Sequence, residues 1–397
     1  MNRATKKIKI KNPWIINPFF GYGLFWSLAI IMYFLSPSKA NSSLDMNLIV
    51  ILSVTIVVSF FCAHFFNKKF KNKVFEIKYK KPSVWLTVFL LILYVAEFVY
   101  SGQIPIVDTL NGSGGAYKEF GIPTLHVLIV TFGIFYGIYH AYMFLCFKRK
   151  SNALITLFVF LYFLLIFSRG MMVFCGVVCV VLYLVNKKIK LGTIVVLSIL
   201  AVVVMWLFGI FGNIRGGADW NDTSEFLRLA KIDADPYGFF SPLYWVEEYI
   251  ICSLRNLNYN VSFGPDYSVN AFFGSVVPDF IGKRIFDVEN PIRLLMSEFT
   301  TATMYAATYI SSGYLGMLIS FGLYLLSAKI VMSIRMSDAS CELISYSILF
   351  FLFAMSIFDN MLVYSGYSFA LVFAILYGVR HFFRVFDHKR QTVSIKV

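Results

Sequence analysis

Charged residues are scarce in this chain. Asp, Glu, Lys and Arg make up only 14% of its 397 residues, while hydrophobic residues make up 59%. About a quarter of the residues of a soluble protein are charged, so this composition excludes an ordinary soluble domain. Several apolar runs approach the roughly 20 residues that cross a hydrocarbon core about 30 Å thick. The sequence therefore predicts an all-α, polytopic membrane protein.

Ten apolar segments are long enough to be predicted as transmembrane helices, and one long polar segment separates the seventh from the eighth. We expect domains at 1–212 (seven spans), 213–300 (a large extracytoplasmic loop with short helices), 301–380 (three spans) and 381–397 (a basic tail). The expected spans are 17–35, 47–66, 84–100, 124–147, 153–167, 171–185, 191–211, 303–331, 343–358 and 362–379.

Acidic residues are fewer than basic ones, and the two kinds are separated along the chain. The net charge is +14, but segment 213–300 carries −5, so the rest of the chain carries +19. This excess lies in alternate connections, and basic connections face the cytoplasm. We therefore expect both termini in the cytoplasm and 213–300 outside. The basic clusters are interpreted as topology signals and lipid headgroup contacts, not as nucleic-acid sites. They lie at 3–11, 68–81, 148–150, 187–190, 329–335 and 380–396.

The six cysteines form no recognisable disulfide framework. Five lie in spans or at their ends, and only Cys252 lies in the outer loop. Cys175 and Cys179 share a helix face, but no histidine or carboxylate is near them in sequence, which argues against a zinc site. We expect no metal and no other cofactor. A small-residue cleavage site after the first span is also missing, so no cleavable signal peptide is evident.

Ionisable residues are almost absent from mid-bilayer positions, which weighs against a coupled transporter. They gather instead at the predicted outer ends of spans and in the outer loop. A carboxylate or histidine there could accept a proton, and arginine binds anionic groups bidentately. The candidates are Glu97, His126, Arg169, Arg215, Glu247, Glu248, Arg255 and Arg293.

Each candidate also has a structural interpretation. Glu97 could lie at the interface, and His126 could be a satisfied structural group. Arg169 could extend to headgroups or face an outer cavity. Arg215 precedes two glycines whose backbone N–H groups could bind an oxyanion. A short helix is expected at 223–231.

Ser241-Pro242 should begin another helix in the outer loop. That helix is expected to extend to about residue 254, with Glu248 and Arg255 on one face. Two interpretations remain open. The helix could lie in the headgroup region, or its polar face could cover an active site.

Short motifs resemble the Wzy-type O-antigen and capsule polymerases. They are Ile104-Pro105-Ile106, the run from Gly115 to His126, Ser168-Arg169-Gly170, Glu298-Phe299-Thr300 and Gly313-Tyr314-Leu315-Gly316. The similarity extends over most of the chain, including the number of spans and the large loop before the last three.

The resemblance implies a glycosyltransferase of the bacterial inner membrane that joins undecaprenyl-diphosphate-linked repeat units without a metal, with a chain-length regulator as a possible partner. By that likeness, Arg169, Arg215 and Arg255 would bind diphosphate and sugar. One family pattern, arginine with glycine eleven residues later, is missing here, because Val180 and Phe226 occupy those positions.

From these arguments we predict a set of site residues. Glu247, Glu248 and His126 are the catalytic candidates, and Arg169, Arg215, Arg255 and Arg293 are the substrate-binding candidates. The alternatives are an O-antigen ligase-type transferase, a flippase or exporter of lipid-linked oligosaccharide, and a structural membrane partner.

Overall fold

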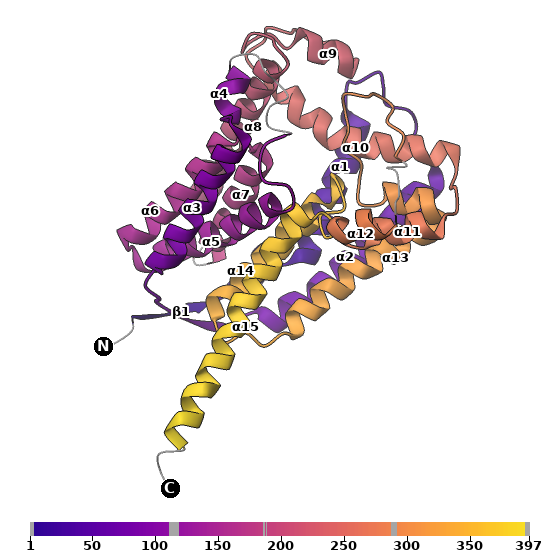
Figure 1. The fold of residues 1–397 in the computed structure, drawn as a ribbon. Helices are drawn as coiled ribbons and strands as arrows, with labels where there is room; N and C mark the ends of the chain where they lie inside the picture. Colours follow the sequence, from indigo (N-terminus) through magenta and orange to yellow (C-terminus); the bar gives the residue numbers. More distant parts are fainter. Residues whose placement is uncertain (1–3, 111–118, 186, 188, 287–291, 394–397) are drawn as a thin grey trace.

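The computed structural model describes residues 4–110, 119–185, 187, 189–286 and 292–393, and nearly all of its regular structure is helical (Figure 1). Within these described residues, seven helices are long and apolar enough to cross a membrane, so the protein is a multi-pass helical membrane protein. They are α1 (Pro18–Leu35), α2 (Met46–Phe70), α3 (Val84–Ser101), α5 (Leu125–Phe147), α8 (Leu191–Arg215), α13 (Ala306–Ser333) and α14 (Ala339–Ala354), which continues into η4 (Met355–Ile357).

The three other predicted spans are shorter apolar helices. They are α6 (Lys150–Leu165), α7 (Arg169–Val185) and the first part of α15 (Ser365–Val393), whose apolar portion ends at Val379. Every predicted apolar segment is therefore helical.

Local capping signals fix where the first spans begin. The Asn17 side chain accepts a hydrogen bond from the amide of Phe20 at 3.2 Å, and Pro18 follows as the first helical residue. Asp45 caps α2 in the same way, through the Leu48 amide at 3.0 Å. These caps explain why the predicted and observed starts agree within a residue or two.

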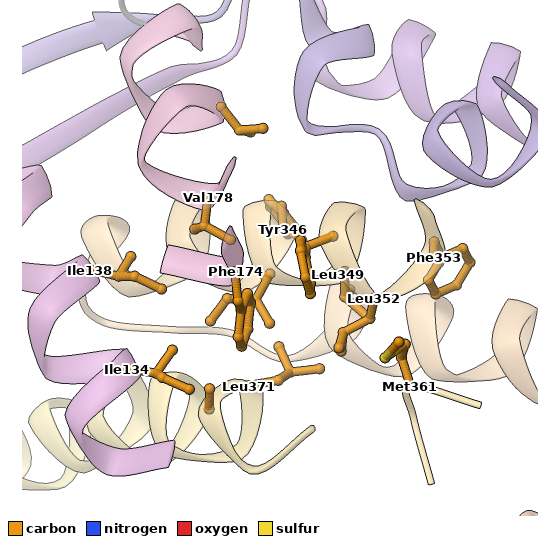
Figure 2. Packing of buried hydrophobic residues seen from close by; sticks show 14 of the residues in the cluster. Ile134, Ile138, Phe174, Val178, Tyr346, Leu349, Leu352, Phe353, Met361 and Leu371 are labelled. Carbon is orange, nitrogen blue, oxygen red and sulfur yellow. The ribbon is translucent and has the colours of Figure 1, made fainter. Parts of the chain in front are cut away.

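Burial separates central helices from peripheral ones. We compare the most apolar stretch of each helix. In α14, 83% of the residues of this stretch are buried, and in α5, 78% are buried. In α8, only 11% are buried. Central α14 packs on α1, α7 and α15, and Phe174 stacks on Phe351 with ring centroids 4.4 Å apart. Figure 2 shows part of this core. The exposed apolar surface of α8 is the kind of face that contacts lipid.

One end of the bundle collects the basic connections. A two-stranded antiparallel sheet lies there, formed by β1 (Thr5–Lys9) and β2 (Val74–Lys78) (Figure 1). Lys73 pairs with Glu342 at 2.7 Å, Lys80 pairs with Asp338, and Lys6 donates to the carbonyl of Cys146. The sheet was not predicted, because its lysines were interpreted only as topology signals.

The opposite end carries segment 213–300, called the outer segment here after its predicted side of the membrane, and the ends of the spans near it are called outer ends. Its helices are α9 (Ser224–Ala230), α10 (Tyr244–Phe263), α11 (Val269–Val276) and α12 (Asp279–Ile285), with η3 (Ser241–Leu243) before α10; α4 (Pro105–Leu110) lies in an earlier connection. The predicted short helices are confirmed. However, α10 continues nine residues beyond the expected end at 254, and α13 is interrupted at Gly313 (φ +63°), so the eighth predicted span is not one regular helix.

The break in α13 has a clear backbone role. The carbonyls of Ile310 and Ser311, just before Gly313, accept hydrogen bonds from the amides of Asp266 and Ser268 at 2.7 and 3.0 Å. A continuous helix would use these carbonyls internally. The interruption therefore attaches the outer segment to α13.

Candidate functional site

A buried carboxylate at the outer end of α3 binds two side chains from other helices. Glu97 is fully buried, and one of its oxygens lies 2.8 Å from Nδ1 of His126, the second residue of α5. Its other oxygen accepts a hydrogen bond from the hydroxyl of Tyr162 on α6. The ring of Tyr162 stacks on Tyr94, with centroids 3.5 Å apart. Three helices thus hold the carboxylate in one orientation.

This contact determines which nitrogen of His126 is available for chemistry. With the carboxylate as the acceptor, the matching tautomer of His126 has the proton on Nδ1 and the lone pair on Nε2. The His126 side chain is 30% exposed, whereas Glu97 is fully covered. Glu97 lies four residues before the end of α3, or about 6 Å along its axis. An oriented, partly exposed imidazole therefore lies near this end of the bundle.

The loop before His126 is shaped to accept its ring. Gly121 has a φ of +103°, and a Cβ at this position would lie 2.4 Å from Nδ1 of His126. The amide of Gly121 donates to the hydroxyl of Ser101 at 2.9 Å. Only glycine combines that backbone angle with this close approach. The Gly121 to His126 part of the motif noted in the sequence thus has a steric reason.

A cation outside the predicted set of site residues contacts the turn before His126. Arg284 on α12 donates to the hydroxyl of Thr124 at 3.3 Å, two residues before His126. The neighbouring Lys283 pairs with Asp279 at 3.7 Å. Helix α12 therefore brings positive charge to the outer end of α5. The signal in the sequence that could have identified Arg284 is the adjacent basic pair Lys283-Arg284, which lies in a segment of net negative charge.

A further carboxylate lies at the outer turn between α14 and α15. Part of Asp359 is exposed to solvent, but the protein atoms packed around its carboxyl group reduce its hydration. This desolvation and the nearby negative charge of Asp279 raise the pKa of Asp359 to about 6. Asp279 accepts a hydrogen bond from the amide of Ser365 at 3.0 Å, which fastens α12 to the start of α15. Titratable groups therefore lie at the start of α5 (His126), on α12 (Asp279 and Lys283) and in the turn before α15 (Asp359).

Glu248 and Arg255 form a bidentate ion pair inside the outer segment. Their side chains are 0% and 1% exposed. The guanidinium binds both oxygens of Glu248, and it also donates to Asn41 at 2.8 Å and to Ser38 at 3.2 Å. The predicted placement of both residues on one helix face is confirmed. This geometry favours a structural role over the predicted catalytic and substrate contacts, because the groups are covered and already bonded.

Three asparagines extend this buried polar face of α10. Asn256 donates to two carbonyls of segment 299–301 at 2.8 Å each, and Asn260 exchanges two hydrogen bonds with the backbone of Arg293. Asn258 binds the connection between α1 and α2. Paired amides of this kind avoid the cost of burying unsatisfied polar groups. Helix α10 is therefore the scaffold of the outer segment.

The remaining predicted arginines lie on separate elements. Arg169 begins α7, and its guanidinium lies 4.6 Å from the ring centroid of Phe208 on α8. Arg215 ends α8, close to Asn213, which accepts a hydrogen bond from Trp245 near the start of α10.

Arg293 lies at the far end of α10 from this contact. Its guanidinium is 4.6 Å from the ring centroid of Phe263, and it pairs with Asp266 at 3.8 Å. From Trp245 to Phe263, α10 rises about 27 Å. Arg215 and Arg293 are therefore too far apart to bind one diphosphate together.

The glycines after Arg215 do not offer free N–H groups, contrary to expectation. The amide of Gly216 donates to Gly212 at 3.0 Å, and the amide of Gly217 donates to Ile214 at 3.1 Å. These hydrogen bonds terminate α8, since the last carbonyls of a helix need partners. The oxyanion site proposed there from the sequence is thus occupied by the end of the helix itself.

Glu247 faces a different region from Glu248. It lines a groove of about 520 Å³ together with Met32, Met205 and residues of the 234–246 segment. Burial raises the pKa of Glu247, and a hydrogen bond with Ser36 opposes that rise. The three predicted catalytic residues therefore do not converge. Of the three, His126 has the geometry of a base with a positioning carboxylate.

No protein-family model, curated protein or solved structure matches this chain.

Proposed function

We propose that this protein is a membrane glycosyltransferase that polymerises undecaprenyl-diphosphate-linked oligosaccharide repeat units into O-antigen or a related surface polysaccharide. One observation carries the proposal: at the outer end of the bundle, His126 is oriented by buried Glu97 with Nε2 available. Arg284 hydrogen-bonds the hydroxyl of Thr124, two residues before His126. The short motifs that resemble Wzy-type polymerases include His126 itself and the turn before it.

In the proposed reaction, a sugar hydroxyl of the incoming repeat unit attacks the anomeric carbon of the growing chain. The bond from that carbon to the diphosphate oxygen breaks, and the polyprenyl diphosphate leaves. Nε2 of His126 accepts the hydroxyl proton, while Glu97 stabilises the imidazolium that forms. Arg284 is a candidate to stabilise the negative charge on the departing diphosphate.

The proposed setting is the bacterial inner membrane, with ten crossings and both termini in the cytoplasm. Two observations support it. The connections rich in lysine and arginine lie at one end of the bundle, as the contacts of Lys6, Lys73 and Lys80 show. The outer segment and His126 lie at the other end, where the diphosphate of a lipid-linked substrate would reach the interface while its polyprenyl tail stays in lipid. A chain-length regulator is a possible partner.

Reconstitution in proteoliposomes with a purified lipid-linked repeat unit tests this proposal. Wild-type protein should produce a ladder of polymers. We expect His126→Gln to lower the rate of polymerisation by a factor of about 10² to 10⁴, the usual contribution of a general base. The matched control is His64→Gln, the same change at an exposed histidine on α2. Equal rates for the two variants would exclude His126 as the base.

Glu97→Gln tests the positioning role separately. The amide can still bind Nδ1, but it does not stabilise an imidazolium, so the pH profile of the rate should shift while the Michaelis constant changes little. An unchanged pH profile would remove Glu97 from the mechanism.

A strain that lacks the gene distinguishes the alternatives. Single repeat units on the carrier or on lipid A core indicate a polymerase. Long polymer accumulating on the carrier indicates a ligase, and substrate retained in the inner leaflet indicates a flippase.

A further inference from the structure

The groove beside Glu247 lies between two spans and a loop of the outer segment. Met32 of α1 and Met205 of α8 line one part of it, and Asp235, Phe239, Phe240 and Glu247 line another. We call it the outer groove. Its volume of about 520 Å³ is within the usual range of small-molecule sites. It is separate from the Glu97–His126 pair.

The residues that line the groove lie at different heights along the two helices. Met32 lies three residues before the end of α1, and Met205 lies ten residues before the end of α8, which is about 15 Å along the axis. Half of a hydrocarbon core is also about 15 Å. A ligand with an apolar tail can therefore place that tail beside Met205 and its polar end beside Glu247.

The spans that border the groove expose apolar surface. Phe34 and Leu35 of α1 are 61% and 77% exposed. On the loop, Phe239 and Phe240 are exposed, and the carbonyl of Phe239 accepts a hydrogen bond from Trp206 of α8 at 2.6 Å. Aromatic residues are enriched at the headgroup level of membranes. These exposed apolar side chains form the surface from which a lipid would enter the groove.

The polar lining of the groove includes two carboxylates. No described cation pairs with Glu247 or Asp235: Glu247 hydrogen-bonds Ser36, and Asp235 accepts from the amide of Tyr237 at 3.0 Å. The ion pairs nearest in sequence use other carboxylates: Asp233 binds Lys39 at 3.6 Å, and Glu248 binds Arg255. Two unpaired carboxylates disfavour an anionic diphosphate and favour a cationic group that donates hydrogen bonds.

We propose that the outer groove binds a phospholipid with a primary ammonium headgroup, such as phosphatidylethanolamine. Its ammonium donates to Glu247 and Asp235, and one acyl chain lies along Met205 and the aromatic loop. The site is independent of the proposed glycosyl transfer, because it shares no residue with the Glu97–His126 pair.

Native mass spectrometry of the purified full-length protein tests the assignment. The probes are dioleoylphosphatidylethanolamine and dioleoylphosphatidylcholine, which differ in whether the headgroup donates hydrogen bonds. Wild-type protein should bind the ethanolamine lipid about tenfold more tightly, the effect of one good charge-assisted contact. The Glu247→Gln, Asp235→Asn double variant should show no preference between the two lipids.

Two further variants separate this result from a general effect of charge or folding. Glu225→Gln with Asp219→Asn makes the same change in charge on exposed residues outside the groove, and it should keep the preference. Met205→Trp fills the lipid end of the groove and should weaken binding of both lipids.

Three outcomes would overturn the proposal. The first is equal affinity of the wild-type protein for the two lipids. The second is a preference that survives in the groove double variant. The third is displacement of the ethanolamine lipid by tail-free glycerophosphoethanolamine at the same concentration, since that would place the site outside the bilayer.

Discussion

Substituting Arg255 by methionine distinguishes a structural arginine from a substrate-binding one. The change keeps most of the side-chain volume but removes four hydrogen bonds, two to Glu248 and one each to Asn41 and Ser38. It also leaves the fully buried Glu248 without a counter-charge. Removing one partner of a buried ion pair typically costs about 3 to 5 kcal/mol.

The magnitude can be measured as a change in thermal stability. With the usual slope of about 2 to 4 °C per kcal/mol for larger domains, Arg255→Met should lower the midpoint of unfolding in detergent by on the order of 10 °C. The assay is size-exclusion chromatography with fluorescence detection after heating. Loss of folded protein from membranes should accompany the shift.

A double variant tests whether the cost comes from the unpaired charge. Replacing both partners, as in Arg255→Met with Glu248→Leu, removes the isolated carboxylate, and apolar replacement of a whole buried pair is often close to neutral. The double variant should therefore be more stable than Arg255→Met alone. If Arg255→Met keeps the wild-type midpoint but loses polymer formation, the structural assignment is wrong and Arg255 belongs to the substrate site.

Three further predictions follow from the same structure. Gly121→Ala should lower the rate of transfer while expression stays normal, because its Cβ would displace His126; Gly102→Ala, whose Cβ meets nothing within 4 Å, is the control for a positive φ. Asn256→Ala should lower the unfolding midpoint, since buried carbonyls lose their donors at about 1 to 3 kcal/mol each. Asp359 has a folded-state pKa of about 6, above its ordinary 3.8. Its contribution to stability is therefore present at low pH and is lost as the pH rises through 6. The variant Asp359→Asn should flatten this part of the pH profile of the unfolding midpoint.

The positions of the helices were largely predictable, because apolar length and capping residues are local signals. The first two spans were predicted to begin at 17 and 47, and the structure has them beginning at Pro18 and Met46, capped by Asn17 and Asp45. The interruption at Gly313 was not predicted, because it depends on the backbone of residues 266 and 268, which pair with the carbonyls just before it. A glycine within an apolar run gives no indication of such a distant partner.

The partners of the charged residues could not be predicted from the sequence. Glu248 and Arg255 are seven residues apart, so their shared face was evident, but their burial depends on Ser38 and Asn41 from the first outer turn. Tyr162 gave no signal at all, since a tyrosine in an aromatic span is unremarkable. Contacts between distant segments decide which charges are structural and which are accessible.

The distribution of hydrogen bonds argues against reacting groups in the long outer segment. There, Arg255 and Asn256 are buried and bonded, so their loss should remove folded protein. His126 differs, because its Nδ1 is bound by Glu97 while its ring stays partly exposed. Side by side, Arg255→Met should reduce folded protein and product together, whereas His126→Gln should reduce only product. The same outcome for both variants would mean that the outer ends of α3 and α5 are scaffold as well, and that the reacting groups lie elsewhere.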